Sequence, residues 1–142
     1  MQKVYAWHDI PHYYGDYVRV LFVAVAVLSA VAVPVFGDLL LFGTLTQVLC
    51  ALLLVLLAGL THPHSAMLSL YNSVVSAIGV ILLQSAAISL YSADSFELFL
   101  TREVAALLLL FAFYFSVKTL RAFAQGKLGK VERPWEFEDS KD

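Results

Sequence analysis

Four histidines are the residues of this sequence with the best-defined metal chemistry, because neutral imidazole is a common metal ligand. His8 and His12 stand four residues apart, but Pro11 between them argues against one regular helix that presents both. His62 and His64 share a short turn, and no His-Glu-x-x-His pattern is present. We therefore treat all four as weak metal candidates and expect them to be interfacial loop residues.

No other arrangement of residues predicts a reaction. The chain has no glycine-rich phosphate loop, no Gly-x-Ser-x-Gly and no Cys-x-x-Cys. Its one cysteine, Cys50, lies in an apolar run and has no partner within the chain for a disulfide. We therefore expect a protein that is not an enzyme and that needs neither a cofactor nor a metal.

Uncharged polar side chains interrupt the apolar runs and could either join helices or line a path for a solute. They are Gln47, Asn72, Ser73, Ser76 and Gln84. In a bilayer such groups hydrogen-bond across helices, at about 0.6 kcal/mol each on average. A transport path usually has an ionisable residue near mid-membrane, and the middle thirds of these runs have none. Interhelical packing is the favoured interpretation, and a solute path between the second and third runs is the alternative.

Arg102 and Glu103 follow the start of the last apolar run closely. A helix that begins near Ser95 places them about 10 Å along its axis. This depth is shallow enough for Arg102 to extend its guanidinium to the membrane interface. We predict interfacial anchoring for Arg102. The alternative is an interhelical or intersubunit ion pair, with Asp38 as a candidate partner.

Four apolar runs must position these groups, and they cover residues 17–36, 39–60, 67–91 and 96–117. Each has the roughly 20 residues with which a helix crosses a hydrocarbon core of about 30 Å. The chain of 142 residues is 61% hydrophobic and 14% charged, with a mean hydropathy of +0.81. Soluble domains are about 45–50% apolar and 25% charged. The sequence therefore predicts an all-α, integral membrane four-helix bundle.

The connections between the runs are short, which predicts an up-down-up-down bundle with consecutive helices antiparallel and adjacent. Asp94 with Glu97 three residues later resembles a capping box, so the last helix should begin near Ser95. Gly126 is expected to stop that helix near Gln125. We divide the chain into an interfacial segment (1–16), a four-helix transmembrane domain (17–124) and a charged cytoplasmic tail (125–142).

Basic residues predict the orientation of the bundle. Eight of the nine Lys and Arg residues fall on the side that holds both ends of the chain, and only Arg102 falls on the other. Because cytoplasmic loops are enriched in Lys and Arg, both ends are expected to be cytoplasmic. The basic start of the tail is suited to anionic lipid headgroups. A net charge of −2 gives no indication of nucleic acid binding.

These observations favour a small multi-pass membrane protein that acts as a non-enzymatic structural or assembly module. We expect the lipid bilayer, a second copy of the chain or another membrane protein as partners. One alternative is a small channel or transporter subunit that uses the polar residues of the second and third runs. A histidine-dependent membrane metalloenzyme is a third. Short loops and the lack of a targeting sequence indicate a prokaryotic plasma membrane.

Overall fold

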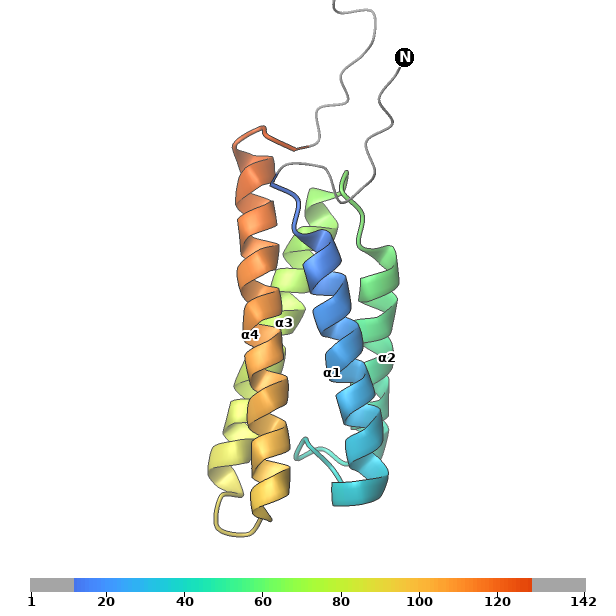
Figure 1. The fold of residues 1–142 in the computed structure, drawn as a ribbon, viewed down its shortest axis with the longest axis vertical. Helices are drawn as coiled ribbons and strands as arrows, with labels where there is room; N and C mark the ends of the chain where they lie inside the picture. The colour runs from blue at the N-terminus through green and yellow to red at the C-terminus, as the bar shows by residue number, and fades with distance from the viewer. Residues whose placement is uncertain (1–11, 129–142) are drawn as a thin grey trace, which may run out of the picture.

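A computed structural model of the protein describes residues 12–128, which form four α-helices and no strand. The helices are α1 (Gly15–Phe36), α2 (Thr44–Leu60), α3 (Ala66–Ser89) and α4 (Phe96–Ala124). They form an elongated bundle in which the start of α1 and the end of α4 lie at the same end (Figure 1). We call this the terminal end and the opposite one the distal end. The predicted all-α, four-helix bundle is confirmed.

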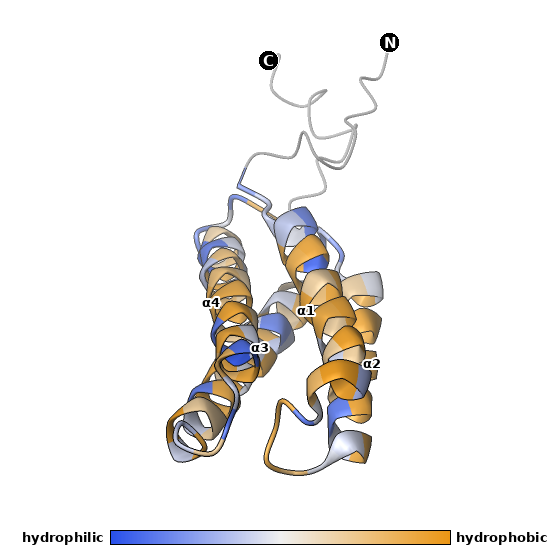
Figure 2. Cartoon of the chain, turned by 60° about the horizontal axis from the view of Figure 1, so that its bottom comes forward, coloured by the Kyte–Doolittle hydropathy of each residue, from blue (hydrophilic) through white to orange (hydrophobic). Residues whose placement is uncertain are grey.

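Three of the described helices, α1, α3 and α4, are long and apolar enough to cross a membrane. The helix α2 is apolar too but has 17 residues, which is about 25 Å at 1.5 Å per residue. Large hydrophobic side chains are exposed on all four helices, and hydrophobic colouring covers much of the bundle in Figure 2. So much exposed apolar surface is typical of a protein that faces lipid rather than water, which indicates membrane association.

The second helix begins five residues later than the apolar run predicts, at Thr44 rather than at Leu39. The intervening segment is a loop between Gly37 and Gly43, whose φ angles of +88° and +86° suit glycine and break the helix. Leu39 in this loop is almost completely buried. Apolar composition alone could not distinguish such a buried loop from the first turn of a membrane helix.

The helices follow one another around the bundle in the order α2, α1, α4, α3, and α2 scarcely touches α3. The prediction that all consecutive helices are adjacent is therefore wrong for this pair. Small residues explain the closest packing, between α3 and α4: an added Cβ on Gly79 would lie 2.5 Å from Leu109 Cδ1. Ala86 and Ala105 are also completely buried. Small side chains let helix backbones approach closely, whereas α2 is rich in leucine.

The ends of α4 confirm one prediction and correct another. Its N-cap is Ser95, whose hydroxyl accepts a hydrogen bond from the Leu98 N–H at 3.3 Å. The predicted start near Ser95 is confirmed, but the capping box of Asp94 and Glu97 is wrong, because the cap is one residue later. The helix ends at Ala124, and Gly126 with a φ of +68° lies in the left-handed conformation that terminates helices.

Candidate functional site

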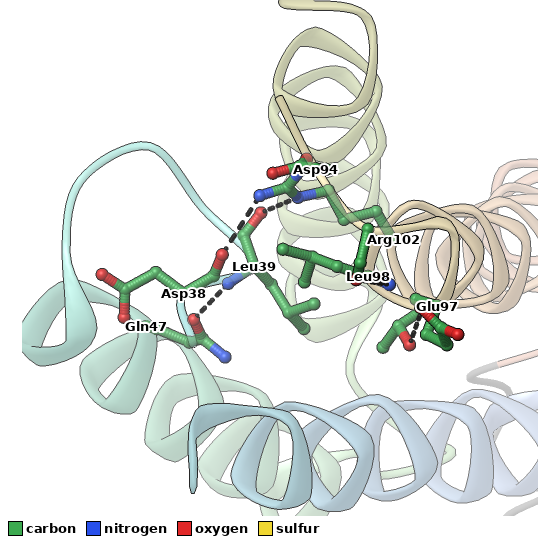
Figure 3. A network of polar contacts seen from close by, with 9 residues as sticks. Asp38, Leu39, Gln47, Asp94, Glu97, Leu98 and Arg102 are labelled. Atoms are coloured by element: carbon green, nitrogen blue, oxygen red, sulfur yellow. Dashed lines mark hydrogen bonds and ion pairs between the residues drawn. The ribbon is translucent and has the colours of Figure 1, made fainter. Parts of the chain in front are cut away.

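Arg102 is the largest completely buried side chain of the described residues, with 1% of its surface exposed. Its Nε donates to the Leu39 carbonyl at 2.7 Å and its Nη2 to the Asp38 carbonyl at 3.1 Å. Its Nη1 forms an ion pair with the Asp94 carboxylate (Figure 3). Both connections at the distal end therefore enclose Arg102, and its anchoring at the membrane interface stays a prediction.

Asp38 meets Arg102 through its backbone carbonyl, whereas the ion pair is made with Asp94. The Asp38 carboxylate instead accepts a hydrogen bond from the Thr44 hydroxyl at 2.6 Å, at the start of α2. Glu103 points elsewhere and accepts a hydrogen bond from Gln84 Nε2 at 3.0 Å, across the α3–α4 seam. The structure thus places the three charged candidates in three separate contacts rather than in one ion-pair cluster.

Gln47 holds the connection between α1 and α2, which we call the distal loop, from its other side. Its Oε1 accepts a hydrogen bond from the Leu39 N–H at 2.7 Å, and its Nε2 donates to the Ser29 carbonyl at 3.1 Å. Both backbone groups of Leu39 therefore bond to side chains, since its carbonyl accepts from Arg102. Irregular backbone at membrane depth is tolerated where the protein itself satisfies its polar groups. Arg102 and Gln47 together allow this loop to be buried.

A second arginine has a similar role at the terminal end. Arg19 of α1 donates from Nε to the Ala58 carbonyl at 2.9 Å and from Nη2 to the Thr61 carbonyl at 2.6 Å. The Thr61 hydroxyl accepts a hydrogen bond from Asn72 Nδ2 at 3.1 Å. The last carbonyls of a helix have no partner within it. Arg19 and Asn72 therefore fix the end of α2 to α1 and α3.

An apolar groove with a volume of about 180 Å³ lies where α2 and α3 fail to meet. Leu53 and Ile78 line it and are about half exposed, so the groove opens between these two helices. Its polar lining residues, Ser29 and Gln47, are bonded to each other through the Ser29 carbonyl. The groove also contains Cys50, the one cysteine of the chain.

The polar residues that could join helices or line a path do not converge on one route. Asn72 faces the α2–α3 connection at the terminal end, and Gln47 faces the distal loop. Ser73 and Ser76 are buried and donate to the carbonyls four residues earlier in α3. Gln84 contacts Glu103. The contacts of Asn72, Gln47 and Gln84 join different elements at separate heights, whereas those of Ser73 and Ser76 stay within α3.

The histidines do not form a ligand cluster in the part of the chain that the structure describes. No group of three or more His, Cys, Asp or Glu side chains within residues 12–128 could hold a metal ion. His62 and His64 have ring centroids 5.1 Å apart, and the His62 Nδ1 accepts a hydrogen bond from the His64 N–H at 3.2 Å. His12 lies on a different segment, before α1, and His8 lies outside the described residues.

Sequence reasoning missed two features of this site. The sequence predicts a helix cap at Asp94, whereas its pairing with Arg102 depends on how the two distal connections meet in space. Arg19 is one of the eight basic residues that predict the cytoplasmic side, and its charge does not indicate that it caps another helix. Comparison with models of protein families, with curated proteins and with solved structures found no match to this chain.

Proposed function

We propose that this chain is a multi-pass protein of a prokaryotic plasma membrane, with both ends cytoplasmic, and that it acts as a non-enzymatic assembly module. In this proposal two copies pair through α2 and the groove beside it. The observation that carries the proposal is the open side of the bundle between α2 and α3. The positively charged residues gathered at the terminal end support the orientation.

The packing of α2 supports pairing at this face. Among the described elements α2 packs closely against α1 alone, and it is the shortest of the four helices. Its buried residues are few, and leucines such as Leu49 and Leu52 are exposed over more than half of their surface. In lipid, helices associate through close packing rather than through hydrophobic transfer. A helix from a second copy would give α2 a second packing partner.

The chemistry of the groove supports a helix, rather than a polar solute, as its occupant. The polar groups of Ser29 and Gln47 already bond to each other and to the distal loop. Ala51 supplies a small surface on the α2 side of the groove, where a foreign backbone could approach closely. A twofold pair is the commonest form of soluble homo-oligomer and uses the same surface on both copies. We therefore favour pairing of α2 with α2 across the symmetry axis.

Cys50 provides a direct test, because it lines the groove and is the one thiol in the chain. Membranes that contain the full chain are treated with copper phenanthroline and run on a non-reducing gel. We expect a covalent dimer that a reductant converts to monomer. Light scattering of the untreated protein in mild detergent should give the mass of two copies.

A matched control moves the thiol to another lipid-facing surface. In the Cys50→Ala, Val104→Cys variant the cysteine lies on α4, at an exposed position outside the groove, and we expect little dimer. Ala51→Phe fills the groove and should reduce crosslinking through Cys50. A monomeric mass without a Cys50 crosslink contradicts the proposal. Equal crosslinking at positions 50 and 104 would indicate random collision and contradicts it too.

A further inference from the structure

A basic cleft lies at the terminal end, far from the groove between α2 and α3. Its volume is about 200 Å³, and it forms between the segment that precedes α1 and the end of α4. Three cationic residues line it, Lys118, Arg121 and Lys127, together with His12 and Tyr14. No acidic residue of the described chain is part of its lining. Arg121 and Lys127 have no ion-pair partner among residues 12–128.

The wall of the cleft is held in place by a backbone hydrogen bond and by contacts of the Tyr14 ring. The Tyr14 N–H donates to the Thr119 hydroxyl at 3.2 Å, which joins the segment before α1 to α4. The Lys118 ammonium lies 4.5 Å from the centroid of the Tyr14 ring, a cation–π contact. The Tyr14 ring also stacks on Phe115, with centroids 5.8 Å apart. This arrangement positions Lys118 before any ligand binds.

The turn at Gly126 positions Lys127 as the third cationic residue. The Lys127 N–H donates to the Ala122 carbonyl at 2.9 Å, and the Gly126 N–H donates to the Phe123 carbonyl at 3.0 Å. With the positive φ of Gly126, these two bonds form a Schellman motif, which reverses the chain at the end of a helix. Lys127 therefore folds back to the last turn of α4, where Arg121 lies.

Cationic residues at the end of a helix have an ordinary explanation, since they offset the partial negative charge of the carbonyls there. That charge is about half an elementary charge, and the backbone donors of Gly126 and Lys127 already satisfy two of the final carbonyls. Three whole positive charges exceed what the helix end requires. The surplus around one concave surface is suited to an anion.

We propose that this cleft binds one phosphate group, with Arg121 and Lys127 as its main ligands and Lys118 as the third cation. Arginine forms paired hydrogen bonds with phosphate oxygens, and lysine contributes a point charge. Aromatic rings cluster around the cleft, including Tyr14, Tyr17 and Phe115, as they do at membrane interfaces. The phosphate could belong to a lipid headgroup at that level or to a soluble anion, and the experiment distinguishes these sources.

Native mass spectrometry of the full chain, released from detergent, counts bound molecules directly. The probes are phosphatidylglycerol, phosphatidylcholine and inorganic phosphate. We expect one tightly held phosphatidylglycerol per chain. Phosphatidylcholine should bind at least tenfold more weakly, because the three cationic residues of the cleft repel the quaternary ammonium beside its phosphate. Millimolar inorganic phosphate that displaces the lipid would assign a soluble anion as a second source of the phosphate. No displacement would assign the lipid headgroup alone.

Arg121→Gln with Lys127→Gln should reduce phosphatidylglycerol binding at least tenfold, whereas Arg121→Lys should retain most of it. Both side chains are exposed, so the variants should fold, which helical circular dichroism checks. Lys130→Gln with Lys141→Gln removes the same charge outside the described residues and should change binding less than twofold. Equal losses in the two double variants would indicate diffuse attraction and overturn the proposal. Equal binding of both lipids, or no bound probe, would overturn it as well.

Discussion

The two ends of the bundle hold their helix connections in the same way but in different surroundings. At each end an arginine from one helix donates to two backbone carbonyls outside that helix, in a connection or at the end of another helix. Arg102 does so at the distal end and Arg19 at the terminal end. The Arg102 side chain is 1% exposed and pairs with Asp94, which is also mostly buried. The Arg19 side chain is 38% exposed, and its Nη1 lies 3.6 Å from the Asp16 Oδ1.

The difference shows that burial, rather than the number of hydrogen bonds, determines how much such a contact contributes to stability. A buried charge without its partner is costly, because no water replaces the lost contact. An exposed pair is screened, and water takes over its hydrogen bonds. The distal end should therefore depend on its arginine far more than the terminal end does.

The largest effect is expected for Arg102→Met. This variant leaves the Asp94 carboxylate without a counter-ion and the carbonyls of Asp38 and Leu39 without their donor. Loss of one partner from a buried ion pair typically costs about 3–5 kcal/mol. Unfolding can be followed in detergent by the loss of helical circular dichroism. A loss of less than about 1 kcal/mol in the free energy of unfolding would show that water reaches the distal end.

Arg121→Met is a suitable control for Arg102→Met, because it removes the same charge from α4 at an exposed position. Its side chain makes no hydrogen bond or ion pair within the described part of the chain. We expect its unfolding curve to match that of the natural protein. Similar losses in both variants would mean that overall charge, rather than the buried contact, determines stability.

Asp94→Asn should have the next largest effect. It removes the counter-ion but keeps an oxygen that can accept a hydrogen bond, and the two carbonyl contacts of Arg102 remain. Hydrogen bonds to charged groups contribute about 1.5–3 kcal/mol, and we expect a loss in this range. A double-mutant cycle with Arg102→Met isolates the pair. Strictly additive losses would show that the two side chains do not interact.

The distal end also shows which parts of this structure could be predicted from sequence. Four helices, the start near Ser95 and the stop before Gly126 follow from local composition and cap residues. The burial of Arg102 does not, because a position about 10 Å along a helix suits either an interfacial or a buried arginine. The choice depends on Leu39 and Asp94, which belong to two connections that meet only after folding. The groove likewise depends on which helices pack together, and small-residue patterns alone do not fix that.

Gln47→Leu tests the other support of the distal loop. It removes the acceptor of the Leu39 N–H and the donor to the Ser29 carbonyl without adding a charge. Leaving buried backbone groups unpaired should lower the free energy of unfolding by about 1–2 kcal/mol. Gln84→Leu is the matched control, since its contact with Glu103 is only partly buried. An effect of Gln84→Leu equal to that of Gln47→Leu would contradict the special role of the distal loop.

Arg19→Met applies the same change at the terminal end and tests the comparison most directly. Its carbonyl partners belong to buried residues, Ala58 and Thr61, but the Arg19 side chain is 38% exposed, so water can enter the space that it leaves. We expect a loss of about 0.5–1 kcal/mol, several times smaller than for Arg102→Met. The same circular dichroism assay measures both variants. A loss as large as that of Arg102→Met would remove the distinction between the two ends.

The smallest effect is expected for Tyr13→Phe. This residue shows that part of the terminal end is shielded from water. Tyr13 is almost buried there against Ala122 and Leu128, and its hydroxyl has no hydrogen-bond partner among residues 12–128. Removing an unpaired buried hydroxyl should raise the free energy of unfolding by about 0.5 kcal/mol.

The dependence of stability on alkaline pH provides the control for Tyr13. Burial, with a smaller contribution from Asp16, raises the pKa of Tyr13 from 10.0 to about 12. A group whose pKa is higher in the folded protein contributes stability that is complete below pH 10 and is lost as the pH rises towards 12. Titration of the natural protein should show this loss, and Tyr13→Phe should lack it. Tyr17→Phe, whose ring is 60% exposed, should retain it. Identical alkaline slopes for Tyr13→Phe and the natural protein would mean that water reaches Tyr13 as it reaches Arg19.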